Sequence, residues 1–171
     1  GLAGCCAAIE AASCGASVIL LEKAAKLGGN SAKATSGING WGTRPQGNKD
    51  IVDGPKFFER DTHLSGLGGT TEVGLVQMLS VKSGEAIGWL MKNFDLPLTI
   101  VSQLGGHSRP RTHRAPDQKD GTPVPIGYTI MKHLTDHIES KLKGRVTIMT
   151  KTVVASLMHE THESADGTSR T

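Results

Sequence analysis

Gly1-Leu-Ala-Gly4 opens the sequence, and Ser17-Val-Ile-Leu-Leu-Glu22 follows it after a segment of small, helix-forming residues. Gly15, which closes that segment, suits the left-handed end of a helix. The run 17–21 is short, continuously apolar and rich in branched side chains, which is typical of a buried parallel strand. The order helix, glycine, buried strand and acid matches the second half of a βαβ unit, so this stretch predicts an α/β fold.

The same stretch fits part of a dinucleotide-binding fingerprint, which consists of strand, G-x-G-x-x-G, helix, strand and acid. Residues 1–4 supply the G-x-x-G half, and Glu22 lies eighteen residues beyond Gly4, at the end of the predicted strand. The helix N-terminus would offer N–H groups and a partial positive charge to phosphates, and the acid would accept hydrogen bonds from a ribose. These residues alone also allow a glycine turn before an ordinary helix, with Glu22 a solvated strand end.

The hydrophobic pattern predicts further elements beyond Glu22. The clearest is an amphipathic helix over 129–142, whose apolar residues recur at intervals of four. Residues 72–94 predict one or two helices interrupted near Ser83-Gly84, and Asp166-Gly167 predicts a hairpin turn with no room for its second strand. The expected strands are 98–101, 146–149 and 153–158, and the expected irregular stretches are 28–54 and 105–127.

Composition and charge exclude few partners. The chain has 171 residues and a net charge of +3, and its densest basic run, 107–114, has no interleaved aromatic residues, so no nucleic-acid binding is expected. No apolar run reaches the ~18–20 residues that cross a bilayer, and no signal peptide precedes the fold, so we expect a soluble intracellular protein. Three cysteines, all within the first fourteen residues, argue against a disulfide framework.

Several basic side chains are candidate ligands. His133 and His137 have the i, i+4 spacing of metal ligands. No third ligand stands in the pattern that zinc requires, so we expect a solvated helix face and no metal. Arg111, His113 and Arg114 could bind a dicarboxylate, because guanidinium groups match carboxylates. We favour a surface or cofactor-side loop over direct substrate binding for these three.

The residues after Glu22 resemble a known family. The run 1–42, which includes Leu27-Gly-Gly-Asn-Ser31 and Ala34-Thr-Ser-Gly-Ile-Asn39, is similar to the FAD-binding segment of the fumarate reductase and succinate dehydrogenase flavoprotein superfamily. Three later segments resemble the soluble fumarate reductases, most of all the NADH-dependent type of kinetoplastid protists: Leu104-Gly-Gly-His-Ser108, Arg111-Thr-His-Arg114 and Ile126-Gly-Tyr-Thr-Ile-Met131. The resemblance covers essentially the whole chain.

The resemblance implies roles at the adenosine and pyrophosphate end of FAD. Ala3 and Gly4 would pack under the pyrophosphate. Glu22 would bind the adenosine ribose, and Lys23 would lie beside the adenosine half. Backbone would be presented to the adenine by Val153 or Val154.

At the flavin end, the resemblance implies that Asn30 and Ser31 contact the phosphate and ribityl groups. A loop of small residues would run beside the isoalloxazine ring, with backbone N–H groups near its reactive edge. Close backbone approach and few charges suit a flavin, because charged side chains on the ring would alter its potential. The loop residues are Thr35, Ser36, Gly37 and Ile38.

The family reduces fumarate, an unsaturated dicarboxylate, with a hydride from flavin N5, an arginine as proton donor and further Arg and His residues on the carboxylates. In the family these groups belong to a capping domain and a later segment, which would lie beyond Thr171. We therefore assign no catalytic residue. NADH is a possible electron donor, and a mitochondrial or glycosomal location is possible.

We thus expect an α/β, Rossmann-like FAD-binding module with a parallel sheet, truncated at both ends. Residues 1–171 would form a partial FAD-binding domain that lacks its first strand and its capping and catalytic domain, and would be inactive alone. The absence of an initial Met also suggests that the chain begins inside its gene. The alternatives are another FAD oxidoreductase of the superfamily, of the ketosteroid dehydrogenase or aspartate oxidase type, or a non-catalytic fragment.

Overall fold

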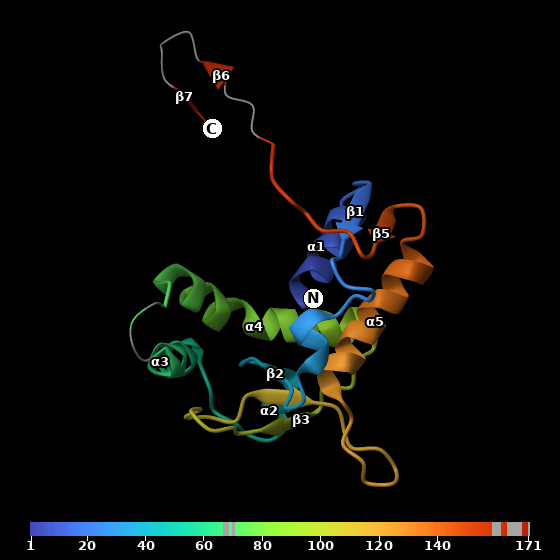
Figure 1. The fold of residues 1–171 in the computed structure, drawn as a ribbon. Helices are drawn as coiled ribbons and strands as arrows, with labels where there is room; N and C mark the ends of the chain where they lie inside the picture. The colour runs from blue at the N-terminus through green and yellow to red at the C-terminus, as the bar shows by residue number, and fades with distance from the viewer. Residues whose placement is uncertain (67–68, 70, 159–161, 164–168, 171) are drawn as a thin grey trace.

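A parallel strand pair lies at one end of the fold. The computed structural model describes residues 1–66, 69, 71–158, 162–163 and 169–170. Strand β1 (Val18–Leu21) pairs in parallel with β5 (Val146–Met149), with Val18 opposite Val146. Figure 1 shows the two strands side by side. The parallel pairing predicted for the run 17–21 is therefore confirmed, whereas its predicted burial is wrong, because Ile19 and Leu21 are 65% and 43% exposed.

Three helices supply most of the core. Helix α1 (Leu2–Ser13) buries one alanine-rich face, and α5 (Ile126–Lys141) buries its apolar stripe, as the spacing of four predicts. Helix α5 begins directly after Pro125, three residues before the predicted start. Helix α4 (Val73–Phe94) contributes its C-terminal half. The buried side chains of this core include Ala8, Ile9, Ile87, Leu90, Phe94, Ile130, Leu134 and Ile138.

Helix α4 is continuous, so the interruption expected near Ser83-Gly84 is wrong. Gly84 lies against the backbone carbonyl of Trp41, and a side chain there would overlap that carbonyl. The backbone N–H of Trp41 donates to Ser83 Oγ at 3.4 Å, and its indole N–H donates to the Ser80 carbonyl oxygen. The glycine therefore permits close packing of a loop on the helix.

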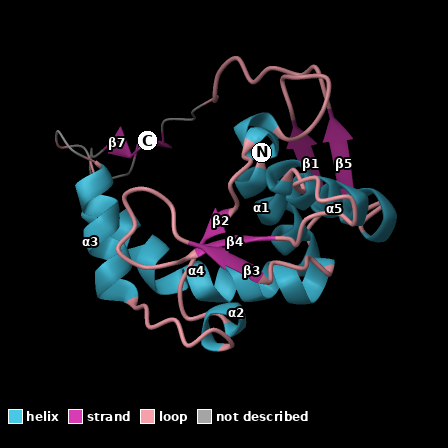
Figure 2. Cartoon of the chain, turned by 90° about the horizontal axis from the view of Figure 1, so that it is seen from below, coloured by secondary structure: helices cyan, strands magenta, loops and turns pink. Residues whose placement is uncertain are grey.

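A second sheet is antiparallel, with the order β2-β4-β3. Its strands are β2 (Ile38–Asn39), β4 (Thr112–Arg114) and β3 (Ile100–Ser102). Figure 2 shows β4 between the other two. Strand β3 overlaps the predicted strand 98–101. Strand β4 lies within 105–127, where only a loop was expected, because its polar sequence gives no strand signal.

The remaining elements are short. The irregular stretch 28–54 contains the 3-10 helix η1 (Gly29–Lys33) and α2 (Arg44–Gly47), and α3 (Pro55–Ser65) follows it. The strand expected at 153–158 is wrong: these exposed residues are not in a strand and pair with none of the residues that the structure describes. The turn expected at Asp166-Gly167 lies outside the described residues. Its second strand is present, however, because β6 (His162–Glu163) pairs with β7 (Ser169–Arg170).

Candidate cofactor site

The N-terminus of α1 faces the segment 28–33. The backbone N–H of Leu2 donates to Ser31 Oγ at 3.0 Å, which places η1 directly beside the first turn of the helix. Ala3 and Gly4, in that same turn, are exposed. The first turn contains no acidic residue that would neutralise its partial positive charge. Phosphate oxygens can therefore reach unpaired N–H groups at this helix end.

Glu22 follows β1 at its carboxyl end and is half-buried. Its Oε1 accepts a hydrogen bond from the Ala24 N–H at 2.9 Å, and its backbone N–H donates to the Met149 carbonyl at 2.9 Å. The N–H of Thr152 donates to the Glu22 carbonyl at 3.0 Å, so the chain that leads to Val153 runs beside Glu22. The structure thus brings together the acid and the segment expected at the adenosine.

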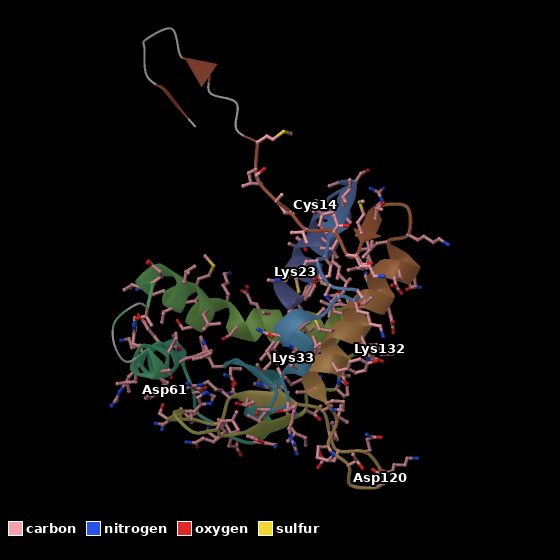
Figure 3. All side chains as sticks on the ribbon, in the orientation of Figure 1. Cys14, Lys23, Lys33, Asp61, Asp120 and Lys132 are labelled. Carbon is pink, nitrogen blue, oxygen red and sulfur yellow. The ribbon has the colours of Figure 1, made fainter. Side chains whose placement is uncertain are left out.

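Val153 and Val154 differ from the expected strand pair. Their side chains are 70% and 58% exposed, and their backbone follows the end of β5 without pairing. Lys23, labelled in Figure 3, is also exposed, next to Glu22 in the chain.

The loop expected at the flavin continues from η1 into β2. Asn30, Thr35 and Ser36 are exposed, whereas Gly37 and Ile38 are half-buried. Together with the start of α1, this loop lines a cavity of about 170 Å³. The lining residues are Leu2, Ser31, Ala34, Gly37, Ile38, Gly127, Ile130 and Met131.

Several of the residues expected at the cofactor lie in two groups. One group is the α1 N-terminus with Ser31, Gly37 and Ile38, which line the same cavity, and the other is Glu22 with the segment leading to Val153. Gly127 was missed from the sequence: its N–H donates to the Ala34 carbonyl at 2.9 Å, and any side chain there would overlap the backbone of η1. The signal was an Ile-Gly pair at a helix start, which has no special meaning without its contact.

The residues present fit a flavin dinucleotide. Gly28 is buried and packs against Ala32. A Cβ atom on Gly28 would lie only 2.8 Å from the Cβ of Ala32, so the backbone there leaves no room for a side chain. The lining is small or apolar apart from Ser31, which suits an isoalloxazine ring. The cavity is smaller than the ~300–1,000 Å³ typical of complete ligand sites.

Arg111 and His113 are fully buried, which excludes the surface placement that was one of the two alternatives favoured for these residues. Arg111 donates from Nε and Nη2 to the two carboxylate oxygens of Asp53, at 3.0 and 2.9 Å, and from Nη1 to Asp61 at 2.6 Å. Asp61, labelled on α3 in Figure 3, also accepts from the N–H and hydroxyl of Ser108. Burial alone would raise the pKa of Asp61, but these hydrogen bonds and the Arg111 charge lower it.

His113 lies between two fixed partners. Its Nδ1 lies 3.0 Å from the Arg111 carbonyl oxygen, which only accepts, so Nδ1 carries the hydrogen. Its Nε2 then accepts from the Thr43 hydroxyl at 2.6 Å. Burial lowers the pKa of His113, which keeps the ring neutral and this tautomer in place. Arg114 differs from both neighbours: it is half-buried and paired with Asp117 at 3.2 Å.

His133 and His137 do not form the solvated face that we expected. Both are partly buried against Phe94: His133 Nδ1 donates to its carbonyl oxygen at 2.7 Å, and the His137 ring meets its ring edge-on at 5.1 Å. Among the described residues, no group of three or more His, Cys, Asp or Glu side chains could hold a metal ion. Cys5, Cys6 and Cys14 are free thiols.

The exposed helix end, the acid after a parallel strand and the close-packed glycines define a dinucleotide-binding α/β module. Residues 1–169 match the family described as "FAD binding domain", and the chain belongs to this family. It is 41% identical over 165 residues to fumarate reductase 1 of Saccharomyces cerevisiae, covering 95% of this chain and 33% of the yeast protein. It is 38% identical over 130 residues to NADH:fumarate oxidoreductase of Klebsiella pneumoniae, covering 76% of this chain and 13% of that protein.

A solved structure agrees with these relatives. The open conformation of a flavocytochrome c3 fumarate reductase superposes with a TM-score of 0.81 at 28% identity, covering 94% of this chain and 27% of that chain. The chain thus spans about a third or less of the length of the proteins that it matches. The matches confirm the resemblance to the fumarate reductase superfamily, the α/β fold class and FAD as the cofactor.

Within the ranges that the structure describes, every helix is too short or too polar to cross a bilayer.

Proposed function

We propose that this chain forms the FAD-binding part of an oxidoreductase that reduces fumarate to succinate. The observation that carries the proposal is that Leu2 of the α1 N-terminus, Ser31 and the loop residues Gly37 and Ile38 line one cavity, in a chain whose relatives are fumarate reductases. Bound FAD would supply the hydride that the carbon–carbon double bond of fumarate accepts. NADH is the proposed electron donor, supported by the Klebsiella relative named for it.

The residues of this chain would bind and orient the cofactor. The free N–H groups of Ala3 and Gly4 would donate to the pyrophosphate, and Glu22 would accept from the adenosine ribose through the oxygen that Ala24 leaves free. Lys23 and the backbone at Val153 or Val154 would border the adenosine. Ring-side contacts would come from Asn30, Ser31, Thr35, Ser36, Gly37 and Ile38.

The described side chains offer no group suited to hold a dicarboxylate beside this loop. The guanidinium group of Arg111 is already paired with the carboxylates of Asp53 and Asp61. We therefore propose that the carboxylate ligands and the proton donor of the reaction lie outside this chain's residues, and that the chain alone binds FAD without turnover. Fumarate reduction by the repurified chain, above a heat-killed control, would contradict this division of roles.

Flavin binding tests the proposed site directly. The chain should bind FAD, and Glu22→Ala should weaken binding by about 1.5–3 kcal/mol, the range for a hydrogen bond to a charged group. Glu10→Ala is the matched control, because Glu10 is an exposed acid in the last turn of α1, at the opposite end of the helix from the proposed pyrophosphate site. Equal FAD affinity in the two variants, measured by fluorescence titration, would remove Glu22 from the site.

A further inference from the structure

Arg111 is at the centre of a buried charge cluster that the proposed reaction does not use. Its side chain is fully buried, and those of Asp53 and Asp61 are 1% and 6% exposed. Three of its N–H groups donate to the two carboxylates, and its guanidinium carbon lies 4.7 Å from the centre of the Phe58 ring. Burial would lower the pKa of Arg111, but the two carboxylates outweigh it and raise the pKa, so the cation persists.

This cluster is poorly suited to bind a dicarboxylate. One cation faces two carboxylates, so the three side chains leave a net negative charge that repels anions. The planar fork of the guanidinium is already engaged, and no solvent reaches it. Arg111 is therefore better explained by a structural role, through the residues that it contacts.

The backbone of Arg111 connects the cluster to the loop that lines the cavity. Its carbonyl oxygen accepts from the Gly40 N–H at 2.9 Å, directly after β2. The next residue, Thr112, donates from Oγ1 to Asn39 Oδ1 at 2.7 Å, and Ile38 pairs with His113. Each residue from 38 to 40 is thus bonded to, or paired with, one of residues 111–113.

The short strands cannot hold this arrangement alone. Strand β2 has two residues and β4 has three, and such small sheets are marginally stable without further packing. The two carboxylates come from different places, one from the turn before α3 and one from α3 itself. Because a buried charge without its partners is very costly, the cluster allows β4 only one position between these elements.

We propose that Arg111, held by Asp53 and Asp61, is a positioning residue that sets the conformation of segment 37–40 and thereby how this segment meets the isoalloxazine ring. The proposal rests on the proposed placement of the flavin beside residues 35–38. Arg111 itself does not touch the cofactor; it acts through β4 and the backbone of β2.

The test compares Arg111→Lys with Arg109→Lys. Lysine keeps the charge but loses the fork that spans two carboxylates. Arg109 is a suitable control because it lies two residues away, partly exposed, with its guanidinium 4.5 Å from the Phe57 ring. Amide hydrogen exchange in the full chain without flavin is the first readout. Arg111→Lys should raise the amide exchange rates of residues 37–40 at least about tenfold more than those of residues 18–21 in β1. Local opening around β2 should leave the separate β1-β5 sheet unaffected.

The second readout uses the flavin. In the FAD-loaded chain, Arg111→Lys should shift the flavin midpoint potential and weaken FAD binding several-fold, and Arg109→Lys should change neither. If Arg111→Lys lacks a cooperative unfolding transition, Asp61→Asn replaces it, because that variant keeps Arg111 paired with Asp53. The same two readouts and expectations apply.

Either of two results overturns the proposal. One is exchange that rises equally in 37–40 and 18–21, which indicates general loss of stability. The other is an FAD affinity and midpoint potential equal to those of Arg109→Lys, which shows that the cluster does not act on the flavin. Neither readout involves fumarate. The proposed reaction can therefore fail while Arg111 keeps this role, and the reverse also holds.

Discussion

Gly37 packs directly against the backbone of His113, so closely that a methyl group on Gly37 would overlap the His113 carbonyl oxygen. Gly37 also has φ of 134°, a conformation that side chains disfavour. The contact joins the loop proposed to face the flavin to β4, the strand that directly follows Arg111. Both the close approach and the backbone angle therefore require glycine.

Gly37→Ala should destabilise the fold more than the equivalent change at Gly42. Gly42 also has a positive φ, 71°, but faces open space, so Gly42→Ala carries only the backbone strain of about 1–3 kcal/mol. Gly37→Ala adds the overlap with His113, which should cost about 1–3 kcal/mol more. Denaturant unfolding measures both. Equal losses would show that the loop can move away from β4 at no cost.

Two glycines of α4 should respond oppositely to alanine. Gly88 faces open space, so Gly88→Ala should stabilise the chain by up to about 1 kcal/mol, the helix-propensity gain. Gly84→Ala has the same gain, but its methyl group would overlap the Trp41 carbonyl, so a net loss is expected. Thermal unfolding of the two variants decides this, and stabilisation by Gly84→Ala would show that Trp41 is not firmly packed on the helix.

Replacing either of two aspartates that pair with cations should lower the free energy of unfolding by different amounts. Asp61→Ala leaves Arg111 short of one of its two buried partners and should cost about 3–5 kcal/mol of unfolding free energy. Asp136→Ala removes the partner of Lys132 on the exposed face of α5, and its effect should be small, because water screens that pair. Comparable losses in the two variants would mean that the cluster around Arg111 is solvated in solution.

Acid should destabilise the fold through its buried histidines. Burial lowers the pKa values of His113 and His107 below the usual 6.5. As the pH falls below 6.5, these histidines become protonated in the unfolded chain but stay neutral in the folded chain. The free energy of unfolding therefore decreases as the pH drops from 6.5 towards the lower pKa values of the folded state. Unfolding free energies at about pH 7.5 and 5.5 should show the loss.

The contribution of His113 can be separated by substitution. His113→Asn should reduce the difference between the two pH values, whereas His63→Asn, which removes a partly buried histidine of α3, serves as the control. An unchanged pH difference in His113→Asn would assign the effect to other groups.

The sequence predicted the elements whose pattern is local. The spacing of four in α5 follows from burial of one helix face, and the distance from Gly4 to Glu22 follows from one helix and one strand. The apolar run at β1 predicted the strand but not its exposed face, which carries Ile19 and Leu21. Strand β4 gave no such signal, because it is stabilised by its neighbours and by Arg111.

The burial of Arg111 could not be predicted for the same reason. A run rich in Arg and His has the composition of a solvated loop, and its compensating acids, Asp53 and Asp61, stand 58 and 50 residues earlier in the chain. Residues 153–158 show the opposite error: they are apolar enough for a strand, yet they pair with no strand in the described part of the chain. Local composition does not specify long-range partners.

The parallel pairing of β1 with β5 also constrains the order of folding. Arg145, just before β5, donates to the Gly15 carbonyl across a separation of 130 residues, so closing this contact orders most of the chain at once. Such long loops are entropically expensive and slow to close. During synthesis, β1 must wait for β5 before the two strands can pair. The sheet that carries Glu22 is therefore completed late, when α4 and α5 have already been made.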